Sequence, residues 1–276
     1  MGIIVGLDVG GSNTKIVGLY ENRILDCQMA SASDPVASSF GALGKFIDAN
    51  HLKISDITCL KITGVGAGFP TGDLLGIPTI RVPEFPATGL GGLYLTGLPR
   101  AIVVSMGTGT AFIEAEGHSI RHIIGSGVGG GTLLGLAQNM LHIRDFDGLS
   151  ELAATGSLGT VDLTIGDISK VEIPGLPMDT TASNFGKNQE HACREDKAAG
   201  ILNLVYQSIG TMSVLAARMA SVDHVILTGH MTTSASCEAT FASFSRLYRM
   251  QFHIPEKALY ATAIGAAIFS DTMSEA

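Results

Sequence analysis

The feature that most constrains this chain is a short apolar segment that ends in a glycine turn and is followed by a second apolar segment. This arrangement occurs twice: residues 3–7 lead through the turn at 8–13 into 14–19, and residues 101–105 lead through MGTGT into 111–114. Short runs rich in β-branched residues and bounded by glycine are typical of buried strands. The copies lie about one hundred residues apart, which predicts an internal duplication and excludes the short period of a solenoid.

Helical periodicity separates and follows these strands. Apolar residues recur at helical spacing over 36–49, and a helix is expected from 132 to about 141. The strongest pattern covers 195–221, where a broad apolar face predicts a helix that packs on the core or on another subunit. Residues 160–192 have no clear period and predict a long excursion. The whole pattern predicts an α/β protein.

Composition argues against several classes of partner. The 17 basic and 25 acidic residues give a formal net charge of −8 without a basic cluster, so nucleic-acid and anionic-membrane binding are not expected. The four cysteines have no CxxC spacing, which suits a reducing cytoplasm and no zinc site. Gly, Ser or charged residues interrupt every long apolar stretch, and the first residues do not resemble a signal peptide. We therefore expect a cytoplasmic protein without a membrane segment.

The first glycine turn, DVGGSNTK, combines a carboxylate with free backbone amides. A carboxylate at a strand end can hold Mg²⁺ through water, which makes Asp8 the candidate metal ligand. Glycines let backbone N–H groups face phosphate oxygens, and Lys15 can reach the transferring phosphoryl group as a point charge. The turn is neither a Walker A loop nor a dinucleotide fingerprint, and an ordinary hairpin turn is the alternative. The candidate phosphate-binding residues here are Asp8, Gly10, Gly11, Ser12, Asn13, Thr14 and Lys15.

Two further glycine-rich segments follow in order. SMGTGT offers the hydroxyls of Thr108 and Thr110 beside glycine amides at the end of a strand. GSGVGGGT leads into a helix, whose N-terminus favours an anion through its free N–H groups and dipole. VILTGH ends another strand in glycine and is a candidate nucleoside contact. One glycine loop is weak evidence, but several in this order predict a nucleotide site.

This order of motifs resembles the phosphate-1, phosphate-2 and adenosine motifs of the acetate and sugar kinase/Hsp70/actin superfamily. Within it, the chain is similar to the type II pantothenate kinases: DVGGSNTK resembles their DxGGTxxK, and SMGTGT, GSGVGGGTLLGL and TASNFG match in order. The resemblance implies a two-lobed, ribonuclease H-like (actin-like ATPase) fold with duplicated mixed-sheet domains. Residues 1–98 would form the N-terminal lobe, and 99–276 the C-terminal lobe with a long dimerisation helix. A homodimer is implied as well.

The resemblance also implies roles for single residues. VPEFPATGLGG resembles the stretch that carries the family's catalytic glutamate, which makes Glu84 the general base. Lys15 would act beside it, and Phe146 falls where an aromatic ring packs on adenine. The ATP contacts that the resemblance adds are Thr108, Gly130, Gly131, Thr132, Leu133, Leu134, Phe146 and His230.

One position departs from the family pattern. The family has an arginine just before the third loop that binds the substrate and helps the transition state, and alignment from the glycine triplet puts His122 there, after Arg121. A neutral imidazole is a weaker anion clamp than a guanidinium. In a strand, Arg121 and His122 point to opposite faces, so one does not simply replace the other. Either residue is a candidate for the substrate contact.

The resemblance implies phosphorylation of pantothenate by ATP with Mg²⁺, the first step of coenzyme A synthesis. Two alternatives remain open. One is a kinase for another hydroxylated molecule such as an amino sugar, although such kinases generally use an aspartate base. The other is a nucleotide-binding homologue with weakened catalysis, which the histidine at position 122 keeps open.

Overall fold

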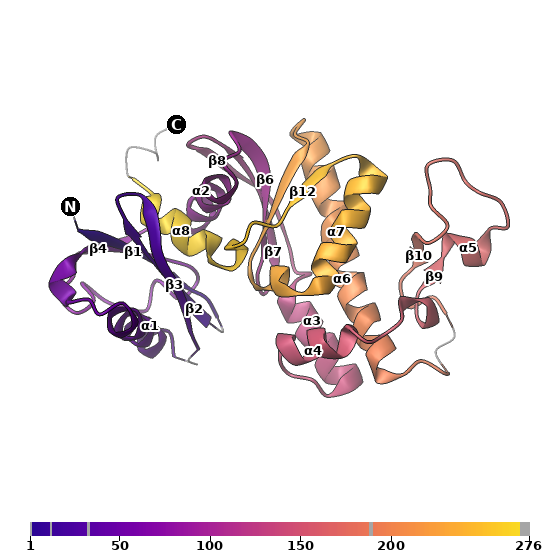
Figure 1. The fold of residues 1–276 in the computed structure, drawn as a ribbon, viewed down its shortest axis with the longest axis horizontal. Helices are drawn as coiled ribbons and strands as arrows, with labels where there is room; N and C mark the ends of the chain where they lie inside the picture. The colour runs from indigo at the N-terminus through magenta and orange to yellow at the C-terminus, as the bar shows by residue number, and fades with distance from the viewer. Residues whose placement is uncertain (1, 12, 32–33, 188–189, 271–276) are drawn as a thin grey trace.

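The computed structural model describes residues 2–11, 13–31, 34–187 and 190–270 of the chain. Its two main sheets have five strands each, and helices pack on both of them (Figure 1). The strands of the first sheet are β1 (Ile3–Val9), β2 (Asn13–Tyr20), β3 (Arg23–Ser31), β4 (Ile57–Thr63) and β5 (Thr79–Arg81). Those of the second are β6 (Arg100–Met106), β7 (Thr110–Glu116), β8 (Ser119–Ser126), β11 (His224–Thr228) and β12 (Gln251–His253).

The remaining elements connect and cover these sheets. The helices are α1 (Pro35–Ala49), α2 (Glu84–Thr96), α3 (Gly130–Leu141), α4 (Phe146–Ala153), α5 (Ile165–Ile168), α6 (Arg194–Met219), α7 (Ala235–Tyr248) and α8 (Ala261–Ile268). A small sheet pairs β9 (Leu163–Thr164) with β10 (Thr181–Ser183). Short 3-10 turns occupy Ile54–Asp56, Leu158–Thr160, His230–Thr233 and Ala258–Tyr260.

The two large sheets have the same topology. The first has the order β3-β2-β1-β4-β5 and the second β8-β7-β6-β11-β12. In each, three strands form an antiparallel meander, and two more add in parallel beside the first strand of that meander. The predicted duplication of a mixed sheet is therefore confirmed.

The first sheet is covered by helices from both ends of the chain. Helix α1 begins at Pro35, where the Asp34 side chain accepts a hydrogen bond from the Ala37 amide, and Phe46 packs against the sheet. On the other side lies α8, whose small residues approach the strands closely: a Cβ added at Gly6 would lie 2.0 Å from the Ala263 carbonyl oxygen. The C-terminal helix thus packs on the N-terminal sheet, as Figure 1 shows.

Helices α2 and α8 cross between the two sheets. A Cβ added at Gly91 would lie 1.8 Å from the Ala261 carbonyl oxygen, and one at Gly265 would lie 1.6 Å from that of Ala87. Only glycine fits at such backbone-to-backbone contacts. Because α2 also packs on β6 and β7, this crossing connects the first sheet to the second.

Helix α6 is the long helix expected near 195–221, and it lies in the core of the second half. Its buried face meets α3, α4 and α7, and the Tyr206 hydroxyl donates to the Met231 carbonyl at 2.7 Å. By length and composition alone it could cross a membrane, but 67% of its most apolar window is buried in protein, as in a core helix. Leu215 and Met219, at its end, are 56% and 79% exposed.

The excursion before α6 carries β9, β10 and α5 away from the body of the molecule (Figure 1). It is tied to α6 by the fully buried Asp162, which accepts from the Phe185 amide at 2.8 Å and from Asn203 at 2.6 Å. The TASNFG segment is therefore held against the first half of α6.

Candidate functional site

The turn after β1 carries a partly buried ion pair. Asp8 and Lys15 are cross-strand partners, with Lys15 Nζ 3.5 Å from Asp8 Oδ2. Their side chains are only 14% and 16% exposed. Burial raises the pKa of Asp8, and the nearby Lys15 charge acts against that rise. Gly10 donates its N–H to the Asn13 carbonyl at 3.1 Å and closes the turn beside Lys15.

Other predicted residues of this turn have different surroundings. Thr14 is fully buried, and its hydroxyl accepts from Ser38 on α1 at 2.6 Å, so its side chain joins α1 to β2. The Asn13 side chain accepts from Ser31 on β3. Gly11 is exposed, with open space where a Cβ would be. Ser12 lies outside the described residues.

The second and third glycine segments interlock into one structure. Gly130 and Gly131 donate their amides to the carbonyls of Gly107 and Thr108, both at 2.8 Å. A Cβ added at Gly129 would lie 2.7 Å from the Gly109 carbonyl carbon, so these backbones touch directly. The predicted loops therefore form a single cradle at the first turn of α3.

The side chains of this cradle divide into two groups. Thr108 is exposed, whereas Thr132 is half-buried and its Oγ1 donates to the Gly127 carbonyl at 2.9 Å. Leu133 is fully buried in the core, and its amide bonds to the Gly129 carbonyl, which leaves neither group to meet a ligand. Leu134 is half-buried. The geometry leaves Gly107, Thr108 and Gly131 at the surface, and Leu133 serves packing.

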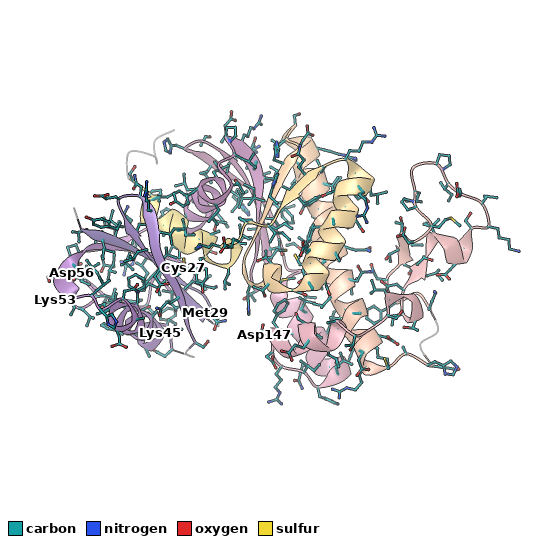
Figure 2. All side chains as sticks on the ribbon, viewed as in Figure 1. Cys27, Met29, Lys45, Lys53, Asp56 and Asp147 are labelled. Carbon is teal, nitrogen blue, oxygen red and sulfur yellow. The ribbon has the colours of Figure 1, made fainter. Side chains whose placement is uncertain are left out.

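His230 begins the 3-10 turn after β11 and lies against α4. Its ring centroid is 5.1 Å from that of Phe146, and Nε2 is 3.7 Å from Asp147 Oδ1. Figure 2 shows Asp147 at the end of α4 that is nearest to the first sheet. Burial lowers the pKa of His230; Asp147 raises it, and the Lys15 charge lowers it further. The two predicted nucleotide contacts, Phe146 and His230, thus lie together within electrostatic range of Lys15.

A matched pair of glycines shapes both halves of the site; sequence reasoning identified Gly229, in VILTGH, but missed Gly64 and the match between the two. Gly64 follows β4 with φ +92°, and Gly229 follows β11 with φ +97°. A Cβ at Gly64 would lie 2.6 Å from Asp8 Oδ1, and one at Gly229 would lie 2.4 Å from the Met106 carbonyl oxygen. The repeated Thr-Gly after a buried strand is the signal that could have identified them.

Glu84 is the first residue of α2, where the helix dipole favours a negative charge. Its side chain reaches solvent, yet surrounding protein atoms partly desolvate it and raise its pKa above that of an ordinary glutamate. The Asp8 charge raises that pKa further, and Lys15 lowers it. The charged turn after β1 and the start of α2 therefore act on one another, as expected for residues of one site.

The structure separates Arg121 from His122. Arg121 pairs with Glu114 on β7, which also accepts from Arg100 at 2.7 Å. His122 instead stacks on Phe85, with ring centroids 4.2 Å apart and planes at 10°. Of the two candidates, His122 is the one that contacts the first turn of α2, through Phe85.

The arrangement suits phosphoryl transfer. A carboxylate with a raised pKa can accept a hydroxyl proton, and the N-terminus of α3 at the glycine cradle has a positive dipole end that favours phosphate. No cluster of three or more His, Cys, Asp or Glu side chains occurs among the residues described.

Comparison with known proteins finds relatives that belong to one family. The Fumble family model matches residues 98–269. A type II pantothenate kinase from Staphylococcus epidermidis is 31% identical over 234 residues, covering 82% of this chain and 84% of that protein. One from Staphylococcus aureus is 28% identical over 273 residues, covering 95% and 97%.

Solved structures give the fold. Component A of the Acidaminococcus fermentans (R)-2-hydroxyglutaryl-CoA dehydratase superposes with a TM-score of 0.69 at 17% identity, over 97% of this chain and 96% of that one. A ROK family glucokinase from Streptomyces griseus, in complex with glucose and AMPPNP, gives 0.59 at 12% identity, over 96% and 98%. These likenesses confirm the predicted actin-like class of two-sheet α/β fold.

Proposed function

Because this chain belongs to the Fumble family and, within it, to the type II pantothenate kinases, we propose that it phosphorylates pantothenate with ATP. The product is 4′-phosphopantothenate, and the reaction is the first step of coenzyme A biosynthesis. The observation that carries the proposal is the carboxylate of Glu84, whose raised pKa responds to Asp8 and Lys15 of the first glycine turn.

Glu84 acts as the general base in this proposal. It accepts the proton of the acceptor's primary hydroxyl as the hydroxyl oxygen bonds to the γ-phosphorus of ATP. The bond from that phosphorus to the β,γ-bridging oxygen breaks, and ADP leaves with the electron pair. The raised pKa of Glu84 makes its carboxylate a stronger base than an ordinary glutamate.

The remaining residues hold and neutralise the phosphates. Lys15 supplies a positive charge, the first glycine turn and the positive dipole end of α3 face phosphate oxygens, and Phe146 with His230 borders the nucleoside. Asp8 would hold Mg²⁺ through water, and the ion would neutralise charge on the phosphate oxygens. Support comes from the position of Asp8, buried at a strand end beside Lys15.

We also propose a homodimer in the cytoplasm. Leu215 and Met219 leave large apolar side chains exposed at the end of α6, which supports contact with a second copy there. Light scattering at micromolar concentration should give twice the monomer mass, and Leu215→Glu should shift it toward the monomer. A monomeric wild-type protein would contradict this part.

The function is tested by ADP release with pantothenate, pantetheine and N-acetylglucosamine as separate acceptors. We expect turnover with pantothenate and phosphopantothenate as the product by mass spectrometry. If only the amino sugar is phosphorylated, pantothenate is not the substrate and the amino sugar takes its place. ATP binding without any product would favour a nucleotide-binding protein that has lost catalysis.

A further inference from the structure

Two histidines on neighbouring strands of the second sheet lie with their rings together. His224 begins β11 and His253 ends β12, and His224 Nδ1 is 3.0 Å from His253 Nε2. The ring centroids are 5.2 Å apart, and the ring planes are tilted by 30°. One imidazole therefore donates its N–H to the bare ring nitrogen of the other, so the two nitrogens face one another.

The register of the two strands places a third polar residue on the same face. Strand β12 forms the edge of the sheet and runs parallel to β11, with Gln251 beside His224 and His253 beside Ile226. Because alternate residues of a strand share a face, Gln251 and His253 lie on the face that carries His224. Both histidines are half-buried and Gln251 is exposed, so an ion can reach all three from solvent.

The His224–His253 pair lies at the end of β11 that is remote from the nucleotide site. The strand runs from His224 to Thr228, and Gly229 and His230 follow its other end. At about 3.3 Å per residue, roughly 13 Å of strand separates the two ends. The proposed phosphoryl transfer therefore gives these two imidazoles no role.

The distance between the facing nitrogens matches the distance that one metal ion requires. Zn²⁺ binds an imidazole nitrogen at about 2.0–2.1 Å, so two such ligands at roughly 90–110° stand about 2.8–3.4 Å apart. The observed 3.0 Å lies within that range, so an ion can take the place of the shared hydrogen without movement of the strands. Burial and the neighbouring His224 lower the pKa of His253, which keeps that ring in the neutral form that binds a metal.

We propose that His224 and His253 bind one divalent transition-metal ion such as Zn²⁺ through the two nitrogens that face one another. The imidazole that donates the hydrogen bond changes tautomer, and its hydrogen moves through water to its other ring nitrogen. Gln251 supplies an amide oxygen from the same face, and water completes the coordination. Because the ion bonds to both strands, it ties the three-residue edge strand β12 to β11 and stabilises the folded chain. This site goes beyond the proposed phosphoryl transfer and does not depend on it.

Calorimetric titration of the untagged, metal-free full chain with ZnCl₂ tests the site, in a buffer with excess Mg²⁺, which prefers oxygen ligands. The wild type should bind one equivalent of Zn²⁺. Loss of an outer partner of a metal ligand weakens binding roughly 10–100-fold, so His224→Gln and His253→Gln, which remove a ligand itself, should each weaken it at least about tenfold. His118→Gln, an exposed histidine in the β7–β8 turn, is the matched control and should bind as wild type. No binding to the wild type, or equal affinity in all four proteins, would overturn the inference.

Two further measurements apply even if a histidine substitution disturbs folding. Gln251→His, at an exposed position on the same face, adds a third imidazole and should tighten Zn²⁺ binding severalfold. Saturating Zn²⁺ should also raise the Tm of the wild type and of His118→Gln, because the ion binds the folded chain and links its two strands. Unchanged affinity in Gln251→His, or a wild-type Tm that Zn²⁺ does not raise, would overturn the inference. Neither measurement requires turnover, so failure of the proposed kinase reaction leaves this test intact.

Discussion

The two halves of the molecule place different side chains on equivalent backbone positions. Asp8 and Ser105 are each the penultimate residue of the first strand of their sheet. Each pairs with a threonine at the end of the parallel neighbour, Thr63 or Thr228, and that threonine precedes a glycine with φ above +90°. Both halves therefore have the same backbone conformation at this strand end, but only the first half has a charged side chain there.

The cross-strand partners extend this difference. Asp8 faces Lys15, whereas Ser105 faces Ala111. The second half instead bonds the carbonyls of its turn to the amides of Gly130 and Gly131 at the start of α3, which makes a neutral glycine cradle. Duplication therefore supplied two similar turns, and we infer that one became specialised for charge and the other for close backbone contact with phosphate.

The largest effect is expected at Glu84, on the helix between the two halves. Glu84→Gln should lower kcat by roughly 10²–10⁴, the usual contribution of a positioned general base. Because desolvation raises the pKa of Glu84, wild-type turnover should fall in acid at a higher pH than an ordinary glutamate would give, and the variant should lack this acid limb. Glu151→Gln, an exposed glutamate on α4, is the control. Near-wild-type turnover in Glu84→Gln would remove Glu84 from the mechanism.

The next comparison removes the polar side chain from each half in turn. Asp8→Asn should lower kcat by roughly 10²–10³, because a charge close to the phosphates is lost. Ser105→Ala should change kcat less than about fivefold, since a single neutral hydrogen bond contributes little. Steady-state kinetics of both variants at saturating MgATP measures the difference. Equal losses of kcat in the two variants would mean that Asp8 and Ser105 contribute similarly to catalysis.

Local sequence patterns could predict much of this comparison. The strands that precede Asp8 and Ser105 are short apolar runs that end in glycine turns, and this signal is local. Duplicated topology followed from finding the pattern twice. Contacts between segments far apart in the sequence could not be predicted from local patterns. Lys61 on β4, for example, donates to the Ala267 carbonyl of α8 at 2.9 Å, 206 residues away. No periodicity predicts that the last helix covers the first sheet.

Side-chain direction was only partly predictable. The opposite directions of Arg121 and His122 follow from strand geometry, but the stacking of His122 on Phe85 depends on how α2 packs against β8. Thr14 and Leu133 belong to motifs that look like ligand contacts, yet both are fully buried. A motif marks which segment forms a turn; tertiary packing decides which of its side chains reach the surface.

The matched glycines after β4 and β11 test whether the two halves share one backbone requirement. Gly64→Ala and Gly229→Ala should each lower the free energy of unfolding by about 1–3 kcal/mol from the left-handed φ, with a further cost from the close backbone contacts. Urea denaturation measures both. Gly41→Ala, within α1 and with nothing within 4 Å of the added Cβ, should be neutral or stabilising. A large loss in only one of the pair would show that the two halves differ in backbone strain.

The smallest effect is expected at Arg121, which the second half uses for an ion pair. Arg121 is 66% exposed and shares Glu114 with Arg100, so Arg121→Ala should cost about 0.2–1 kcal/mol of stability and leave kcat within about threefold of wild type. Hydrogen bonds from Arg100 and Arg121 lower the pKa of Glu114. Their stabilisation is therefore present above the unfolded-state pKa and is lost as pH falls through the lower folded-state value, so the stability difference should vanish in acid. A loss of turnover well beyond threefold would instead mean that the guanidinium leaves Glu114 and reaches the acceptor.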